Sequence, residues 1–178
     1  MLICENVDIW SFVDKGAIGI PTNGYVTRNG AGVMGAGLAL EAKNRYSGIV
    51  YSLGTHLRTK GNIVGWIQKN PHQIIAIPVK PVSLTINTDD DAKEILSRVK
   101  SIYSERPVVV PGYHCKASIQ LIEQSLTQLV DFIKRYNIDR VFIPLLGCGN
   151  GGLSPNKDLF PLLERLNLPD KIVLVTPF

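Results

Sequence analysis

Cysteine is scarce in this sequence, with only Cys4, Cys115 and Cys148 among 178 residues. Three scattered cysteines cannot build a disulfide framework, and none forms a C-x-x-C pair or stands at metal-ligand spacing from a histidine. Small folds held together by disulfides or zinc are therefore excluded. A domain of this length buries roughly 70% of its unfolded surface and needs no such support. A reducing cytoplasm is the expected compartment.

Long hydrophobic runs and a signal peptide are also missing. Residues 1–14 carry Glu5 and Asp8 in place of a basic start followed by an apolar segment. Apolar runs such as Gln73–Val79 and Val141–Leu146 fall far short of the roughly 20 residues that a membrane helix needs. They are typical of buried strands, so we expect a soluble protein with no membrane partner.

No linker, internal repeat or low-complexity segment interrupts the chain. With 45% hydrophobic and 19% charged residues, the composition predicts one ordinary globular domain over residues 1–178. The net charge of +4 weakly favours anionic ligands such as nucleotides or nucleic acid. The basic residues form no dense run, however, and the solvated surface of a mildly basic protein explains the charge equally well.

Short apolar segments bounded by glycine, proline or polar residues predict strands. They are Leu2–Cys4, Ala17–Pro21, Ile74–Val79, Val108–Val110, Val141–Pro144 and Ile172–Val175. Apolar residues spaced by three and four predict helices between them. These helices are Gly37–Tyr46, Ile95–Tyr103, Ile119–Ile133 and Leu159–Leu166. The alternation of strands and helices, with strands apolar on both faces, predicts an α/β protein: a three-layer α/β/α sandwich with a mixed, largely parallel central sheet.

Two glycine-rich segments follow predicted strands. Gly30–Gly37 leads into a predicted helix, and Gly147–Gly152 follows the strand segment Val141–Leu146. Ligands of parallel sheets collect beyond the carboxyl ends of the strands, where exposed backbone amides and helix N-termini can hold phosphate. The first segment is not a dinucleotide fingerprint in its usual place, immediately after the first strand, and there is no G-K-[ST] of a P-loop. Together they predict a cradle for a pyrophosphate, although the first run alone is as readily a flexible loop.

The segments Asn29–Ala39, with G-V-M-G-A-G-L-A, and Leu146–Leu153, with G-C-G-N-G-G-L, resemble the macrodomain family in sequence and in order. The branch that they resemble contains DNA ADP-ribosyl glycohydrolase antitoxins and terminal ADP-ribose glycohydrolases. The likeness extends from Val7–Ile9 to the last strand. It implies ADP-ribose or an ADP-ribosylated substrate as the partner, with nucleic acid a possible acceptor. It implies no cofactor and no metal.

The resemblance also implies individual binding residues. Asp8 matches the acid that accepts a hydrogen bond from the adenine amino group, with the Ile9 amide reading the ring, and Asn23 matches an asparagine near the distal ribose. A helix N-cap at Asp8 and an ordinary Asn-Gly turn at Asn23 are the alternatives. Tyr25–Asn29 resembles a short insertion, which leaves the register of Asn23 open. The implied pyrophosphate-binding residues are Gly32, Val33, Met34, Gly35, Gly37, Gly147, Cys148, Gly149, Asn150, Gly151, Gly152 and Leu153.

Lys80 matches a lysine that, in the glycohydrolase branch, attacks the anomeric carbon or binds the opened sugar as a Schiff base. That chemistry requires a neutral amine, whereas most lysines at strand ends are simply solvated. Asn150–Gly152 contains no counterpart of the acid in the terminal glycohydrolases. Other candidates for proton transfer are His114 and the run Asp89–Asp91, which suits a helix N-terminus equally well. The run lies in a segment, residues 82–112, that is atypical of the family.

The resemblance thus predicts a hydrolase that removes ADP-ribose from an acceptor. The basic charge and the antitoxin-like loop favour nucleic acid over protein as that acceptor. Two alternatives stay open. One is a phosphatase acting on ADP-ribose 1″-phosphate, for which His114 is the nominated catalytic group. The other is a non-catalytic reader or sequestering protein for ADP-ribose or a related nucleotide signal, which the missing acid of the second glycine segment allows.

Overall fold

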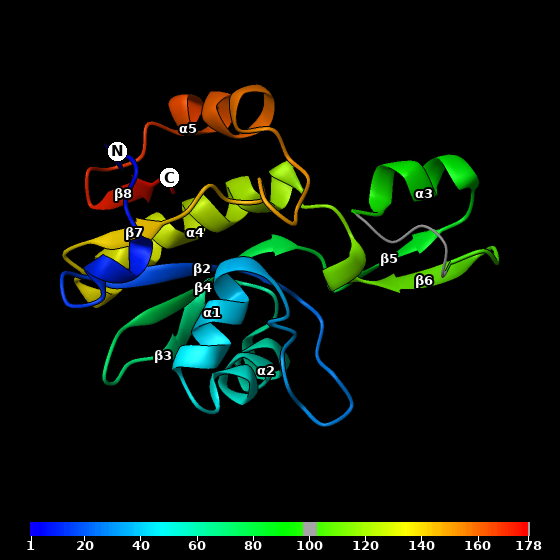
Figure 1. The fold of residues 1–178 in the computed structure, drawn as a ribbon, viewed down its shortest axis with the longest axis horizontal. Helices are drawn as coiled ribbons and strands as arrows, with labels where there is room; N and C mark the ends of the chain where they lie inside the picture. Colours follow the sequence, from blue (N-terminus) through cyan, green and yellow to red (C-terminus); the bar gives the residue numbers. More distant parts are fainter. Residues whose placement is uncertain (98–102, 178) are drawn as a thin grey trace.

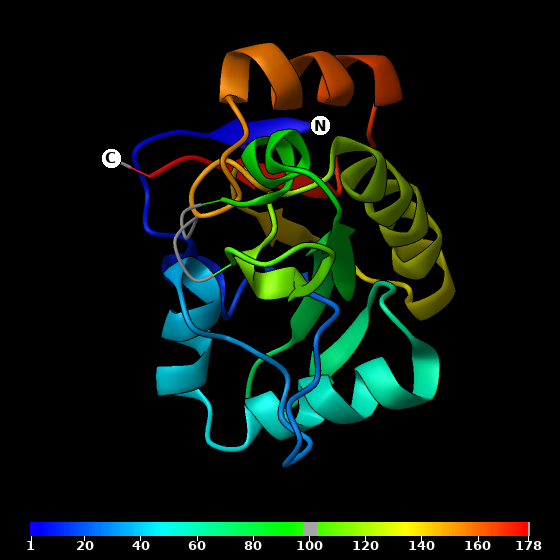
Figure 2. The same cartoon turned by 90° about the vertical axis from the view of Figure 1, so that its right-hand side faces the viewer.

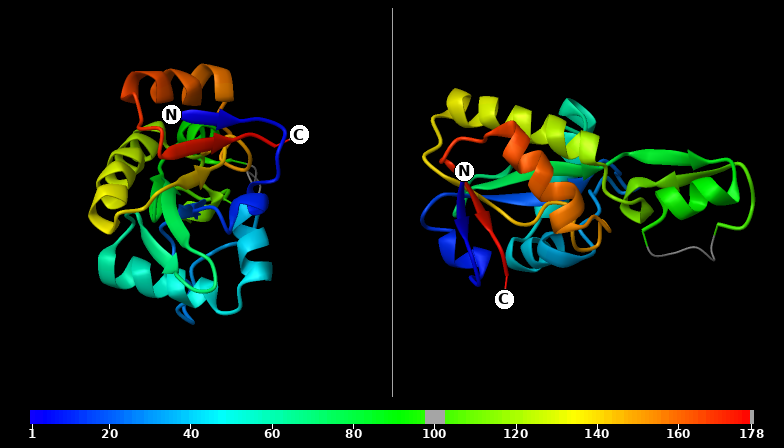
Figure 3. Two further views of the ribbon diagram at one scale, coloured as in Figure 1. Left: turned by 90° about the vertical axis from the view of Figure 1, so that its left-hand side faces the viewer. Right: turned by 90° about the horizontal axis from the view of Figure 1, so that it is seen from above.

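The computed structural model of the protein describes residues 1–97 and 103–177. Its main sheet has six strands in the order β1-β8-β7-β2-β4-β3. All neighbours in this sheet pair in parallel except β3, which is antiparallel to β4. The strands are β1 (Leu2–Cys4), β2 (Ala17–Asn23), β3 (Gly65–Gln68), β4 (Ile74–Lys80), β7 (Val141–Ile143) and β8 (Ile172–Val175). β1 and β8 lie side by side at one edge (Figure 3).

Helices cover both faces of this sheet (Figure 1). Those on one face are α1 (Gly37–Arg45) and α2 (Ile49–Lys60), and those on the other are α4 (Ile119–Tyr136) and α5 (Phe160–Leu166). Every residue of β4 is buried. Ile75 and Ile77 pack in the core with α4 and α5, whereas Ile74 and Ala76 pack in the core with α1 and α2. The predicted three-layer α/β/α sandwich with a mixed, largely parallel sheet is confirmed.

A small lobe projects from one end of the body (Figures 1 and 3). It consists of β5 (Ser83–Ile86), α3 (Asp89–Ile95) and β6 (Val108–Pro111), followed by a helical turn at Gly112–His114. β5 and β6 form their own two-stranded antiparallel sheet, so the predicted strand Val108–Val110 lies outside the main sheet. Figure 2, seen from the lobe side, shows these elements in front of the body, with α5 above them and α2 below.

The lobe has a hydrophobic core of its own, and this core explains one wrong prediction. Ile95–Tyr103 was expected to be a helix, but α3 ends at Ile95 and Leu96 is extended, with a φ of −80° and a ψ of 131°. Leu96 forms a bridge with Cys115 and is buried in the lobe core. Tyr103 is not helical, and the predicted helix positions 99 and 102 lie outside the described residues. The apolar spacing of this segment indicated residues that are buried. A bridged extended segment buries such residues as well as a helix does.

α2 and β3 were not predicted, and α2 supports the first glycine segment. The Gly32 amide donates to the Val50 carbonyl at 2.7 Å. A Cβ at Gly32 would lie 2.5 Å from Leu53 Cγ, and a Cβ at Gly54 would lie 1.9 Å from the Gly30 carbonyl oxygen. Two backbones therefore meet in direct contact where the segment crosses α2. Some of its glycines are required by this packing and not by a ligand.

We expect Gly54→Ala to destabilise the protein. In most helices this change stabilises by about 1 kcal/mol, because glycine has a low helix propensity. Here the added methyl group meets the Gly30 carbonyl, and we expect a net loss of about 2 kcal/mol. Urea denaturation measures the change, with Thr55→Ala on the exposed side of the same helix as the control. An increase in stability in Gly54→Ala would contradict the close packing.

Candidate functional site

A cavity of about 690 Å³ lies at the carboxyl ends of the parallel strands. Asn23 and Lys80, the last residues of β2 and β4, line it, together with Pro144 just after β7 and Val175 at the end of β8. Parallel strands that share a direction deliver their following loops to the same edge of the sheet. The cavity therefore lies where the two glycine segments were expected to meet.

Most of the predicted site residues line this cavity. Those in its wall are Asp8, Ile9, Asn23, Val33, Gly35, Gly37, Lys80, Gly147, Cys148, Gly149, Asn150 and Gly151. The remaining predicted residues are described by the structure but are not part of the wall. They are Gly32, Met34, His114, Gly152 and Leu153. Most residues predicted from the sequence thus lie together in the wall of one cavity. Their roles in binding stay predictions.

The first glycine segment contains glycines of two kinds. Gly30 has a φ of +87°, and Gly32 is crowded by α2, so the fold itself accounts for both. Met34 is buried in the core and anchors the segment from below. Gly35 differs, because its φ is not positive and a Cβ there would meet nothing within 4 Å. Neither backbone strain nor packing requires glycine at this position of the cavity wall.

The second glycine segment repeats the pattern. Gly147 has a φ of +74°, and a Cβ at Gly151 would lie 2.3 Å from the Gly147 carbonyl oxygen. Gly149 again has neither a positive φ nor any atom within 4 Å of an added Cβ. A Cβ at Gly37 would lie 3.5 Å from the Asn150 side-chain amide, so the two segments approach one another. Each of the two segments in the wall therefore contains a glycine, Gly35 or Gly149, that neither the backbone conformation nor the packing requires.

At one end of the cavity, two carboxylates contact the same tryptophan. Asp8 Oδ1 accepts a hydrogen bond from the Trp10 backbone amide at 3.0 Å and caps the helical turn Ile9–Phe12, while the residue also lines the cavity. Glu41 Oε2 accepts from Trp10 Nε1 at 2.6 Å. Neither Glu41 nor Trp10 was predicted. The signal for Glu41 was its position one helical turn after Gly37, which places both on one face of α1.

The side chain of Asn23 forms hydrogen bonds with the first glycine segment and with the turn that follows β2. Its Nδ2 donates to the Val33 carbonyl at 2.9 Å, and its Oδ1 accepts from the Tyr25 amide at 3.1 Å. These bonds use one of its two amide hydrogens and one of the two lone pairs of its oxygen. A second hydrogen remains for a ligand, so the turn at Asn23 and the predicted sugar contact are compatible.

Lys80 joins three parts of the molecule at the other end of the cavity. Its Nζ donates to the Asn150 carbonyl at 3.0 Å and to the Tyr113 carbonyl at 3.3 Å. The residue is only 8% exposed, so the predicted catalytic lysine is not a solvated one. Tyr113 belongs to the lobe, lines the cavity, and packs edge-on against Tyr25 with ring centroids 5.2 Å apart. Tyr25, in the segment that resembles a short insertion, therefore contacts the residue that directly follows the atypical segment 82–112, and it does so beside Lys80.

His114 lies behind the wall and not in it. Its Nδ1 is 2.5 Å from the Tyr103 hydroxyl, and its ring packs edge-on against Tyr113 with centroids 4.4 Å apart. Burial, and then the positive charge of Lys80, lower the pKa of His114. The imidazole is therefore neutral at neutral pH. Tyr113 lines the cavity and packs against the His114 ring. A direct role for His114 would therefore require Tyr113 to move.

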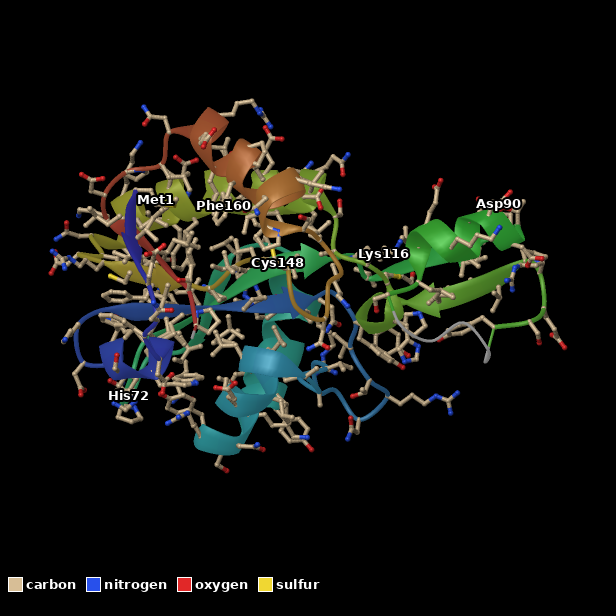
Figure 4. The ribbon with its side chains drawn as sticks, turned by 45° about the horizontal axis from the view of Figure 1, so that its top comes forward. Met1, His72, Asp90, Lys116, Cys148 and Phe160 are labelled. Carbon is tan, nitrogen blue, oxygen red and sulfur yellow. The ribbon has the colours of Figure 1, made fainter. Side chains whose placement is uncertain are left out.

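The acidic run Asp89–Asp91 begins α3. Thr88 caps the helix, its hydroxyl accepting from the Asp91 amide at 3.1 Å, and Asp91 Oδ2 accepts from the Thr88 amide at 3.0 Å. These two bonds lower the free-energy cost of the helix terminus, and hydrogen bonds from the Asn87 and Thr88 amides lower the pKa of Asp91. Figure 4 shows Asp90 at the far end of the lobe from Cys148. The run is a helix N-terminus remote from the cavity.

Cys148 lines the cavity as a protonated thiol. Burial, and then the negative charge of Asp158, raise the pKa of Cys148 to about 11. The Sγ donates weakly to the Leu146 carbonyl at 3.5 Å. A thiol with this pKa is not a nucleophile at neutral pH.

In the described part of the chain, no three or more histidine, cysteine or acidic side chains are arranged so that they could hold a metal ion. None of the described helices combines the length and the apolar character that crossing a membrane requires.

Comparison with known proteins identifies the fold. No family model matches the sequence, and no curated protein matches it. Among solved structures, the macrodomain of Mycobacterium tuberculosis DarG is 20% identical with a TM-score of 0.64, covering 99% of this chain and 98% of that one. The Thermus aquaticus DarG macrodomain is 17% identical with a TM-score of 0.62, covering 99% and 98%. Thermosipho africanus DarTG, solved with ADP-ribose, is 17% identical with a TM-score of 0.62, covering 99% and 42%. The resemblance stated from the glycine segments is thus confirmed for the fold.

We expect Cys148 to be inert towards thiol reagents at neutral pH. Its rate of alkylation should rise with pH up to about 11, because only the thiolate reacts and the pKa is raised to about 11. Peptide mass spectrometry after timed alkylation measures this rate site by site. Cys4 in the same digest controls for reagent quality. A rate for Cys148 that saturates below pH 9 would contradict the proposed electrostatics.

Proposed function

We propose that this protein, which has the macrodomain fold, binds ADP-ribose and hydrolyses the bond between ADP-ribose and an acceptor. The observation that carries the proposal is the pair Gly35 and Gly149. Both line the cavity, one from each glycine segment, and neither the backbone conformation nor the packing of the protein requires glycine there. A ligand that needs bare backbone amides on two sides, such as a pyrophosphate, accounts for both.

The two ends of the cavity suit the two ends of ADP-ribose. The carboxylates of Asp8 and Glu41 line one end and accept hydrogen bonds, so they favour a ligand group that donates them. The amino group of adenine is such a donor. The opposite end offers the remaining Asn23 amide hydrogen and the Lys80 ammonium group beside Tyr113, which suits sugar hydroxyls. In this arrangement the adenine contacts Asp8 and the Ile9 amide, and the distal ribose lies at Lys80. The proposal includes no metal and no cofactor.

Lys80 is the residue that we propose to act at the anomeric carbon. As the structure stands, its Nζ donates to two carbonyl oxygens. To attack carbon, the amine must exchange one of these carbonyls for the sugar and lose a proton. Tyr113 and the lobe stand at this end, so the acceptor would leave past them. We propose nucleic acid as the acceptor, because the chain carries a net charge of +4, and the cytoplasm as the compartment.

A non-catalytic reader of ADP-ribose is the second candidate. The same two hydrogen bonds of Lys80 favour it, because they hold the ammonium group in a bridge between the lobe and the second glycine segment. No carboxylate accompanies Asn150 in that segment to assist a proton transfer. No comparable observation favours the phosphatase, since His114 is not part of the cavity wall.

Gly35→Ala and Gly149→Ala should separate ligand binding from stability. Because nothing lies within 4 Å of either added methyl group, we expect the free energy of unfolding to change by less than about 0.5 kcal/mol. The methyl groups would occupy space and shield amides on the ligand side, so the affinity for ADP-ribose should fall roughly tenfold or more. Calorimetric titration and urea denaturation of the same preparations test both parts. Unchanged affinity in both variants would remove the observation on which the proposal rests.

Lys80→Ala should abolish release of ADP-ribose from an ADP-ribosylated single-stranded oligonucleotide. Lys80→Arg keeps the charge but cannot form a Schiff base, so it should be equally inactive. In the active protein, borohydride reduction should leave the opened sugar attached to Lys80, seen as a mass increase of that peptide. Lys116→Ala, a lysine of the lobe outside the wall, is the control. Full release by Lys80→Ala would exclude the lysine from the mechanism, and saturable binding without release by the wild type would select the reader.

A further inference from the structure

The acidic end of the cavity contains a pair of carboxylates that one residue orients. Asp8 and Glu41 come from segments more than thirty residues apart, and both line the cavity. Each has one oxygen bound by an N–H group of Trp10: the backbone amide binds Asp8 Oδ1 at 3.0 Å, and the indole Nε1 binds Glu41 Oε2 at 2.6 Å. Each carboxylate therefore keeps its second oxygen as an acceptor for a ligand.

Trp10 is itself held firmly. It is 5% exposed, its ring packs against Tyr46 with centroids 6.1 Å apart, and the Arg45 guanidinium lies 4.6 Å above its ring. A cation over the face of an indole is a favourable contact. Arg45 also follows Glu41 by one helical turn, an order that favours an acidic and a basic side chain on the same helix face. The direction of both Trp10 N–H groups, and of the oxygens they bind, is thus fixed before a ligand arrives.

We propose that Glu41 is a specificity-determining residue of this site and that it acts with Asp8 to select a purine that carries an amine at position 6. The inference rests on the proposed binding of ADP-ribose and goes beyond it. An amine at purine position 6 has two hydrogens, and two carboxylate oxygens accept one each. A carbonyl at the same position has only lone pairs, which both carboxylates repel. The site therefore takes adenine nucleotides and rejects hypoxanthine and guanine nucleotides.

Trp10 makes this proposal open to a sharp test. In Glu41→Gln the side-chain oxygen must stay on Trp10 Nε1, because the amide NH₂ cannot accept that hydrogen bond. The amide NH₂ then faces the ligand, and an acceptor becomes a donor in the same place. This variant should lose affinity for an amine and gain affinity for a carbonyl. A variant that merely disturbed the fold would weaken both ligands together.

Calorimetric titration with ADP-ribose and with its hypoxanthine analogue, inosine diphosphate ribose, measures the selection. The wild type should prefer ADP-ribose by roughly tenfold or more, as expected when an unpaired carbonyl faces a site built for an amine. Glu41→Gln should reduce that preference by about tenfold, by weakening ADP-ribose and strengthening the analogue. Glu5→Gln, which makes the same change of charge at an exposed position outside the wall, should leave the preference unchanged.

Two further arms separate this proposal from its alternatives. Trp10→Phe keeps a ring but removes the indole N–H, so Glu41→Gln should no longer shift the preference in that background. ADP-ribose lacking the 2′-hydroxyl of the adenosine should lose the same affinity in the wild type and in Glu41→Gln. If Glu41→Gln instead equalised those two ligands, Glu41 would contact the ribose and the inference would be overturned. An unchanged adenine preference in Glu41→Gln, with ADP-ribose still bound, would also overturn it. Failure of the wild type to bind ADP-ribose would reject the proposed function itself.

Discussion

The parallel pairing of β2 with β4 on one side and with β7 on the other is the constraint on which the rest of the structure depends. It directs the carboxyl ends of the central strands to one edge of the sheet, so the residues that follow them converge. The first glycine segment reaches this edge after β2, the second after β7, and Lys80 ends β4 on the other side of β2. An antiparallel neighbour in either place would have sent one of these segments to the opposite edge.

The cavity that results is electrostatically graded along its length. Asp8 and Glu41 make one end acidic, the glycine segments offer backbone amides in the middle, and the ammonium group of Lys80 lies at the other end. A ligand with hydrogen-bond donors at one end and anionic groups at its centre fits this order. Within this order Cys148 remains a thiol, and His114 lies outside the cavity wall with its ring against Tyr113.

The lobe contributes to the end of the cavity where Lys80 lies. Tyr113 reaches the cavity from the end of β6, and its carbonyl shares the Lys80 ammonium group with the carbonyl of Asn150. The lobe is therefore attached to the site through a charged hydrogen bond as well as through the chain itself. Its core of Leu96, Cys115 and their neighbours is a hydrophobic cluster separate from the two clusters of the body.

Local signals in the sequence carried the prediction of the fold a long way. The apolar segments of β2, β4, β7 and β8 were found because buried parallel strands are continuous apolar runs, and the glycine segments were found by composition. The edge strand β1 was predicted, but the other edge strand, β3, was not. β3 alternates buried and half-buried residues over only four positions, and Leu96 carried a helical spacing that its extended backbone contradicts. Glu41 was missed because its one local signal, a position one helical turn after Gly37, is shared by many exposed acids on helices.

The sequence by itself determined the class of fold, the two glycine segments and the residues at the ends of the central strands, because each depends on residues that are neighbours in the chain. Only the tertiary structure decided which glycines the fold already requires, since that depends on atoms such as the Gly30 carbonyl and Gly54, brought together from separate segments. It also decided that Trp10 orients both Asp8 and Glu41, and that Lys80 is shared by two carbonyls. Hydrogen bonds between distant segments have no pattern along the chain, because their geometry exists only once the sheet has aligned the strand ends.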